Sequence, residues 1–123
     1  MTYLSVLDSE QWSLDRATLM TRLAEDWPGI EVSGAGSDGP SRSLGDVNWR
    51  YVSGLAVLDG YSHPDGTCLY LDGPIELAAS FAVWHRRLVP GDIPLTFCDE
   101  GFNFDVLVTM GTKEDDLIAA GAG

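Results

Sequence analysis

The amino-acid sequence predicts an α+β fold, a two-layer sandwich with a mainly antiparallel sheet and two principal helices. Segments with strand-like and helix-like patterns alternate along the chain. The last two predicted strands follow each other too closely for a parallel crossover, which needs a dozen or more residues. The chain has 123 residues, the length of one ordinary domain, so we expect residues 1–123 to form a single domain.

Two amphipathic segments and one short terminal segment predict helices. In the first, Ser13 is the expected N-cap and Pro28-Gly29 ends an apolar face made of Leu19, Met20, Leu23 and Trp27. In the second, Pro74 occupies the first turn and Pro90-Gly91 ends an apolar line of Leu77, Phe81, Trp84 and Leu88. His85, Arg86 and Arg87 are in its last turn, where positive charge complements the helix dipole. Thr112 is expected to cap a short helix over residues 113–119.

Short apolar runs predict the strands. Residues 3–7 are expected to form the first strand, and residues 30–32 a short second one. Residues 49–58 and 67–71 are expected to form a hairpin with a long turn over residues 59–66. A second hairpin is predicted where Ile93, Leu95 and Phe97 precede Phe104, Val106 and Val108 at alternating positions.

Residues 33–46 are rich in glycine and serine and contain almost no side chain that a core could bury. Loops of this length in small domains are usually binding loops or insertions, so we expect a mobile loop there. Gly34-Ala35-Gly36 lacks the flanking strand and helix of a phosphate-binding loop, and no nucleotide cofactor is predicted.

Acidic residues dominate the charge of the chain. Nineteen Asp and Glu against seven Lys and Arg give a formal net charge of −12. Such a chain repels nucleic acid, whose binding depends on neutralised phosphates, and it attracts basic proteins. The N-terminus has no leader-like pattern and no segment is apolar enough to span a membrane, so we expect a cytoplasmic protein. We further expect the carboxylates to gather on one exposed side.

The residues that could support catalysis are few. His63 precedes Asp65 by two residues in the predicted long turn, and His85 is in the second helix. Cys68 and Cys98 are expected to be buried thiols in strands, and Cys98 is followed by two carboxylates, which raise a thiol pKa. No spacing typical of a zinc site or a nucleophile–base pair is present, so neither catalytic residues nor a metal are predicted. The alternative is a small-molecule-binding or enzymatic domain that uses His63, Asp65, His85 and Cys98.

The favoured interpretation is a non-enzymatic module that binds a basic protein. Carboxylates flank both predicted hairpin turns, and Phe102 would be an exposed aromatic anchor beside the second turn. The predicted binding residues are Asp59, Asp65, Asp72, Asp99, Glu100, Phe102 and Asp105.

Residues 69–118 carry a resemblance to a known group of proteins. Its features are Leu71-Asp72-Gly73, Phe81-Ala82-Val83-Trp84, Leu88-Val89-Pro90, Asp99-Glu100-Gly101 and Gly111-Thr112. This segment resembles the C-terminal half of small bacterial proteins of the immunity type, which belong to polymorphic-toxin and contact-dependent inhibition systems. The resemblance implies a cytoplasmic, non-enzymatic protein that binds and neutralises a toxin domain, often a basic nuclease.

Overall fold

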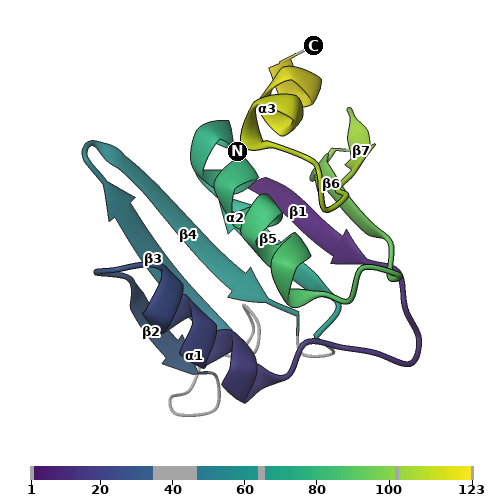
Figure 1. Cartoon of the computed structure of the whole chain (residues 1–123). Coiled ribbons are helices and arrows are strands. Elements are labelled where there is room, and N and C mark those ends of the chain that lie inside the picture. Colours follow the sequence, from purple (N-terminus) through teal and green to yellow (C-terminus); the bar gives the residue numbers. More distant parts are fainter. Residues whose placement is uncertain (1, 35–46, 64–65, 102, 123) are drawn as a thin grey trace.

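The computed structural model describes residues 2–34, 47–63, 66–101 and 103–122. It contains one seven-stranded antiparallel sheet in the order β2-β3-β4-β5-β1-β6-β7. Three helices lie on one side of this sheet (Figure 1). The chain is therefore an α+β two-layer sandwich with an antiparallel sheet, as the sequence predicts.

The strands and helices follow one another in the predicted order, except that the chain forms two strands where one was predicted over residues 49–58. The strands are β1 (Thr2–Leu7), β2 (Glu31–Gly34), β3 (Val47–Ser53), β4 (Ala56–Ser62), β5 (Cys68–Asp72), β6 (Leu95–Asp99) and β7 (Asp105–Leu107). The helices are α1 (Arg16–Asp26), α2 (Ile75–Leu88) and α3 (Glu114–Ala122).

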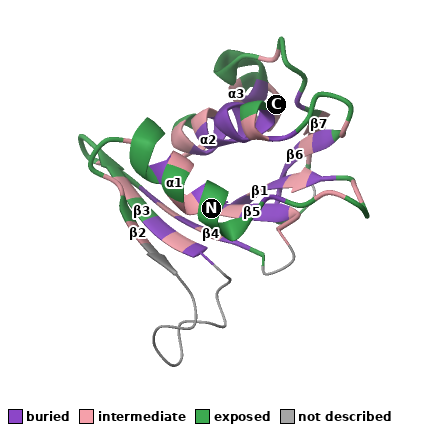
Figure 2. Cartoon of the chain, turned by 60° about the horizontal axis from the view of Figure 1, so that its bottom comes forward, coloured by how far each residue is buried: buried purple, intermediate pink, exposed green. Residues whose placement is uncertain are grey.

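The core lies between the sheet and the helices. Its largest fully buried side chains include Phe81 of α2, Phe97 of β6 and Leu23 of α1. The ring of Trp27 stacks on that of Phe81 with centroids 3.9 Å apart, which joins the end of α1 to α2. In Figure 2 buried residues occur along α2 and within the strands, while exposed residues occupy much of the connecting turns.

Two predicted helix caps are wrong. Asp15, not Ser13, is the N-cap of α1, because its carboxylate accepts a hydrogen bond from the backbone N–H of Thr18. The Thr112 hydroxyl accepts from the backbone N–H of Thr109 and so closes a turn before α3. Serine, threonine and aspartate all form helix caps as well as turns, so residue type alone did not decide which residue would cap each helix.

The first predicted hairpin is also wrong. Residues 49–58 do not form one strand, because the chain reverses at Gly54 and Leu55 and returns as β4. Gly54 has a φ of +62°, and the common two-residue hairpin turns require a positive φ at their first position. Asp59 and Tyr61, expected in a turn, are therefore paired strand residues. Of the predicted loop over residues 33–46, Ser33 and Gly34 belong to β2, and the remainder lies outside the described residues.

Candidate protein-binding face

The sheet has a second side that none of the three helices covers, and we call it the open face (Figure 1). The alternation of side chains along each strand determines which residues lie on it. In β1, Tyr3, Ser5 and Leu7 are buried toward the helices, whereas Leu4 and Val6 are only half-buried on the open face. The strand register then aligns the open-face residues in rows across the sheet.

Two rows contain the notable side chains. One row runs from β2 to β1 through Glu31, Arg50, Asp59, Asp72 and Thr2. The next row runs from β3 to β7 through Asn48, Tyr61, Tyr70, Leu4, Cys98 and Asp105. The open face therefore has an aromatic and apolar row in its centre beside a charged row.

Tyr61 and Tyr70 form the aromatic centre of the open face. Their rings stack with centroids 4.6 Å apart and an interplanar angle of 15°. Both side chains remain half-buried, so their rings are accessible to a partner. Burial raises the pKa of Tyr61, and the charges of Glu100 and Asp72 raise it further. These two carboxylates are therefore close enough to influence the phenol.

Two carboxylates on the open face lie directly opposite each other. Asp59 of β4 and Asp72 of β5 are paired across the strands. Like charges in this position destabilise a sheet. Arg50 relieves part of the repulsion, because its Nε lies 2.7 Å from Asp59 Oδ1 and its second nitrogen donates to Oδ2 at 3.1 Å. The Asp59 hydrogen bond, the charge of Asp59 and that of Glu31 raise the pKa of Arg50.

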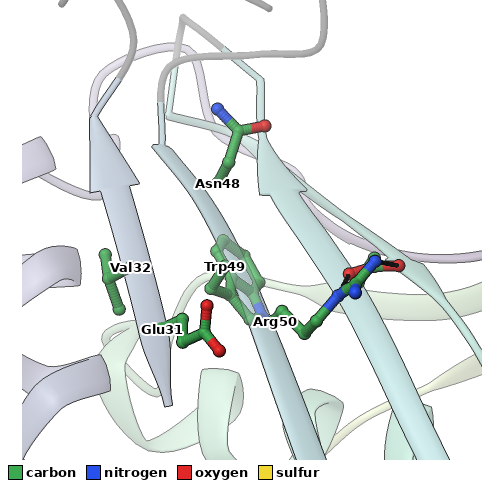
Figure 3. A pocket seen from close by; sticks show the side chains of 6 residues that line it. Glu31, Val32, Asn48, Trp49 and Arg50 are labelled. Atoms are coloured by element: carbon green, nitrogen blue, oxygen red, sulfur yellow. Dashed lines mark hydrogen bonds and ion pairs between the residues drawn. The ribbon is translucent and has the colours of Figure 1, made fainter.

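A shallow pocket on β2, β3 and β4 is lined by Glu31, Val32, Asn48, Trp49, Arg50 and Asp59. In Figure 3 the Arg50 side chain extends to the neighbouring strand, where dashed lines mark its bonds to Asp59. The guanidinium is already paired with a carboxylate, and Glu31 adds further negative charge. This pocket therefore does not suit an anionic ligand.

Four of the seven predicted binding residues lie on the open face or at its border, spread from β4 to β7. Asp59, Asp72 and Asp105 lie on the open face, and Glu100 follows the end of β6, where its backbone N–H bonds to the carbonyl of Thr2. Asp65 and Phe102 lie outside the described residues.

Asp99 is not an exposed binding residue, and that prediction is wrong. It is 4% exposed and paired with Tyr3, whose side chain points toward the helices. Its carboxylate accepts hydrogen bonds from the backbone N–H and side-chain amide of Asn103, at 2.6 and 2.8 Å. These bonds, led by that from the side chain, lower the pKa of Asp99. Asp99 therefore orders the turn between β6 and β7.

The carboxylates do not gather on one side as expected, because the helical layer also carries exposed ones, including Glu25, Glu114 and Asp115. The cations, however, are unevenly distributed. On the described part of the open face, Arg50 is the only Lys or Arg, and it is bound to Asp59. Arg22 and Arg87 lie beside the helical carboxylates and line one hollow with Glu25 and Glu114. The negative charge is thus less compensated on the open face.

The histidines and cysteines do not assemble into a catalytic site in the described part of the chain. His85 was predicted to carry positive charge in the last turn of α2, but it is 1% exposed, and burial lowers its pKa so that the imidazole is neutral. Its Nδ1 lies 2.7 Å from the Oγ of Ser5, which is completely buried, so a substrate cannot reach this pair. Cys98 is buried as predicted, but on the open face, so the sheet separates it from His85. His63 is exposed beyond the end of β4, and Asp65 is not among the described residues.

Tyr61 and Tyr70 are site residues that the sequence reasoning missed. Tyr61 was assigned to a turn because Gly60 and the following Ser-His-Pro-Asp-Gly segment are typical of turns. The signal available for a strand was that Val57, Asp59 and Tyr61 stand at every second position, with Leu58 between them on the other side. Gly60 fits this strand because the Trp49 indole covers it, leaving no room for a Cβ atom.

Comparisons with protein-family models, curated proteins and solved structures found no match for the chain. Among the described residues, no helix is both long and apolar enough to span a membrane. No group of three or more His, Cys, Asp and Glu side chains in this part of the chain is placed to hold a metal ion.

Proposed function

We propose that the chain is a protein-binding module whose open face docks on a basic protein. The observation that carries the proposal is the stacked Tyr61–Tyr70 pair bordered by the carboxylates of Asp72 and Glu100. Tyrosine is enriched at the centres of protein interfaces because it buries a large apolar ring and keeps a polar group. Carboxylates around such a centre attract a cationic partner during encounter and disfavour acidic proteins.

Within this class of function, we propose that the partner is a toxin that the chain neutralises. The support is the resemblance of residues 69–118 to immunity proteins, together with the net charge of −12, which suits a basic nuclease. Neutralisation requires only occupation of the toxin surface and no chemistry by the chain. This role would place the protein in the cytoplasm, where a nuclease toxin acts.

The direct test is co-purification with the product of the neighbouring gene at 50 and 500 mM NaCl. We expect a complex that forms at low salt and weakens at high salt, because salt screens charges at a solvent-exposed interface. The variant Asp72→Asn/Glu100→Gln should weaken the complex at low salt. The matched control is Glu25→Gln/Asp115→Asn, which removes the same charge from the helical layer and should bind as the unmodified chain does.

Failure to bind at 50 mM NaCl would contradict the proposal. An equal loss of affinity in the two double variants would also contradict it, because binding would then follow net charge alone and not the open face.

A further inference from the structure

The hairpin joining β3 and β4 ends in an unusual group of exposed apolar side chains. Val52 is 54% exposed, Val57 is 40% exposed, and Leu55 at the apex is 105% exposed. We call residues 52–57 the hairpin tip. Figure 1 shows that the tip extends beyond α1 and α2, so the helical layer does not cover it. Single exposed leucines are common, but three exposed apolar side chains within six residues indicate a contact surface.

The hairpin tip is built to hold its shape. Val52 is paired with Val57, and Ser53 with Ala56, so the strands remain paired up to the two-residue turn. Gly54 supplies the positive φ at the first turn position, and a Cβ there would meet no atom within 4 Å. The turn therefore needs glycine for its backbone conformation, while nothing in the fold requires a leucine beside it. A preordered loop loses little conformational entropy when it binds.

The hairpin tip is continuous with the open face. Val52 is two residues after Arg50 in β3, and Val57 is two residues before Asp59 in β4. Alternate residues of a strand point the same way, so all four side chains lie on the same side of the sheet. No charged residue occurs from Tyr51 to Leu58. One side of β3 and β4 thus changes from charged at Arg50 and Asp59 to apolar at the tip.

We propose that the hairpin tip inserts Leu55 into an apolar pocket on the same basic protein that the open face binds. This inference rests on the proposed function and adds a second requirement, namely that the partner has an apolar pocket beside its basic surface. The net charge of −12 disfavours the two other surfaces to which the hairpin tip could bind, a membrane and a second copy of the chain. Anionic lipid membranes repel such a chain, and two copies of the chain repel each other.

The two parts of the interface should respond differently to salt. Electrostatic contacts weaken as ionic strength rises, whereas burial of an apolar side chain does not depend on ion screening. Removal of a leucine that fills a pocket of the partner should slow association little but accelerate dissociation. The hairpin tip would then account for the affinity that remains at high salt.

The test measures binding of the purified basic protein identified by co-purification, at 50 and 500 mM NaCl. We expect Leu55→Ser to weaken binding about tenfold or more at both salt concentrations, mainly through faster dissociation. Met110→Ser is the control, because Met110 is 60% exposed but follows β7 at the other edge of the sheet. Leu55 supports no core contact, so the melting temperature of the variant should equal that of the unmodified chain.

The outcomes separate this inference from the proposed function. If Asp72→Asn/Glu100→Gln weakens binding and Leu55→Ser does not, the open face docks as proposed and the role of the tip is wrong. If neither variant changes binding, or no basic protein binds, both proposals are wrong. Sedimentation of the chain with vesicles of phosphatidylcholine and phosphatidylglycerol, lost in Leu55→Ser, would identify a membrane as the occupant and overturn the inference. A dimer in light scattering that Leu55→Ser dissociates would overturn it in favour of a second copy.

Discussion

The buried histidine should make the protein sensitive to mild acid. His85 is 1% exposed, its Nδ1 contacts Ser5 Oγ, and its Nε2 has no hydrogen-bond partner among the described residues. Burial, with the adjacent positive charge of Arg86, lowers the pKa of His85 from 6.5 to about 3. The folded protein therefore keeps this imidazole neutral at pH values where the unfolded chain binds a proton.

The sign and size of the effect follow from this difference in proton binding. Between pH 6.5 and pH 3 the unfolded state holds one more proton, so stability falls as the pH is lowered. Each pH unit in this range costs about 1.4 kcal/mol of unfolding free energy. Between pH 7.5 and pH 5.0 we therefore expect a loss of about 2 kcal/mol from His85 alone. The pH is kept at 5 or above because Asp26 and Asp99 have lowered pKa values in the folded state. Their protonation would therefore destabilise the fold in stronger acid.

The assay is urea unfolding followed by tryptophan fluorescence at pH 7.5, 6.5, 5.5 and 5.0, for the unmodified chain and for His85→Asn. Asparagine keeps a polar group near Ser5 but does not titrate, so the difference between the two chains isolates the contribution of His85. The variant should be less stable at pH 7.5, because a smaller side chain leaves a cavity, yet it should lose about 2 kcal/mol less on acidification. The same pH dependence in both chains would refute the assignment of a neutral, buried His85.

Two further substitutions test the packing and the buried hydrogen bonds. Gly60→Ala should destabilise the fold by about 1–3 kcal/mol, because its Cβ would lie 2.2 Å from the buried indole of Trp49; an unchanged urea midpoint would contradict this. Arg86→Lys should lower stability by about 2–3 kcal/mol in the same assay. The Arg86 guanidinium is 4% exposed and donates to the carbonyls of Ile93, Val108, Val89 and Pro90. Full retention of stability in the variant would show that these bonds are dispensable.

The sequence predicted those elements whose local signals agreed with one another. In α2, the proline at its start, the apolar spacing through Phe81 and the Pro-Gly at its end all indicate the same helix, and the structure confirms it. The alternation in β6 and β7 likewise indicated the second hairpin correctly. Of the basic residues at the end of α2, Arg86 donates from a buried position to the carbonyls of Val89, the C-cap, and Pro90, whereas burial keeps His85 neutral.

Other features depended on contacts that a linear pattern does not contain. The long apolar run from Trp49 was assigned to one strand because Gly54-Leu55 is a weaker turn signal than the glycines and proline after Tyr61. Tertiary pairing reversed that preference and placed Tyr61 beside Tyr70. Asp99 and Glu100 are adjacent in the sequence, yet Asp99 is buried at the end of β6 and Glu100 is exposed in the turn that follows. The open face itself becomes visible only when the register of all seven strands is known.

The most direct test of docking through the open face is amide chemical-shift mapping of the isotope-labelled chain, titrated with its purified basic partner. We expect the largest changes at β4 and β5, around Tyr61, Tyr70 and Asp72, and little change in α1 and α2. Largest changes over the helices, with those two strands unaffected, would contradict it.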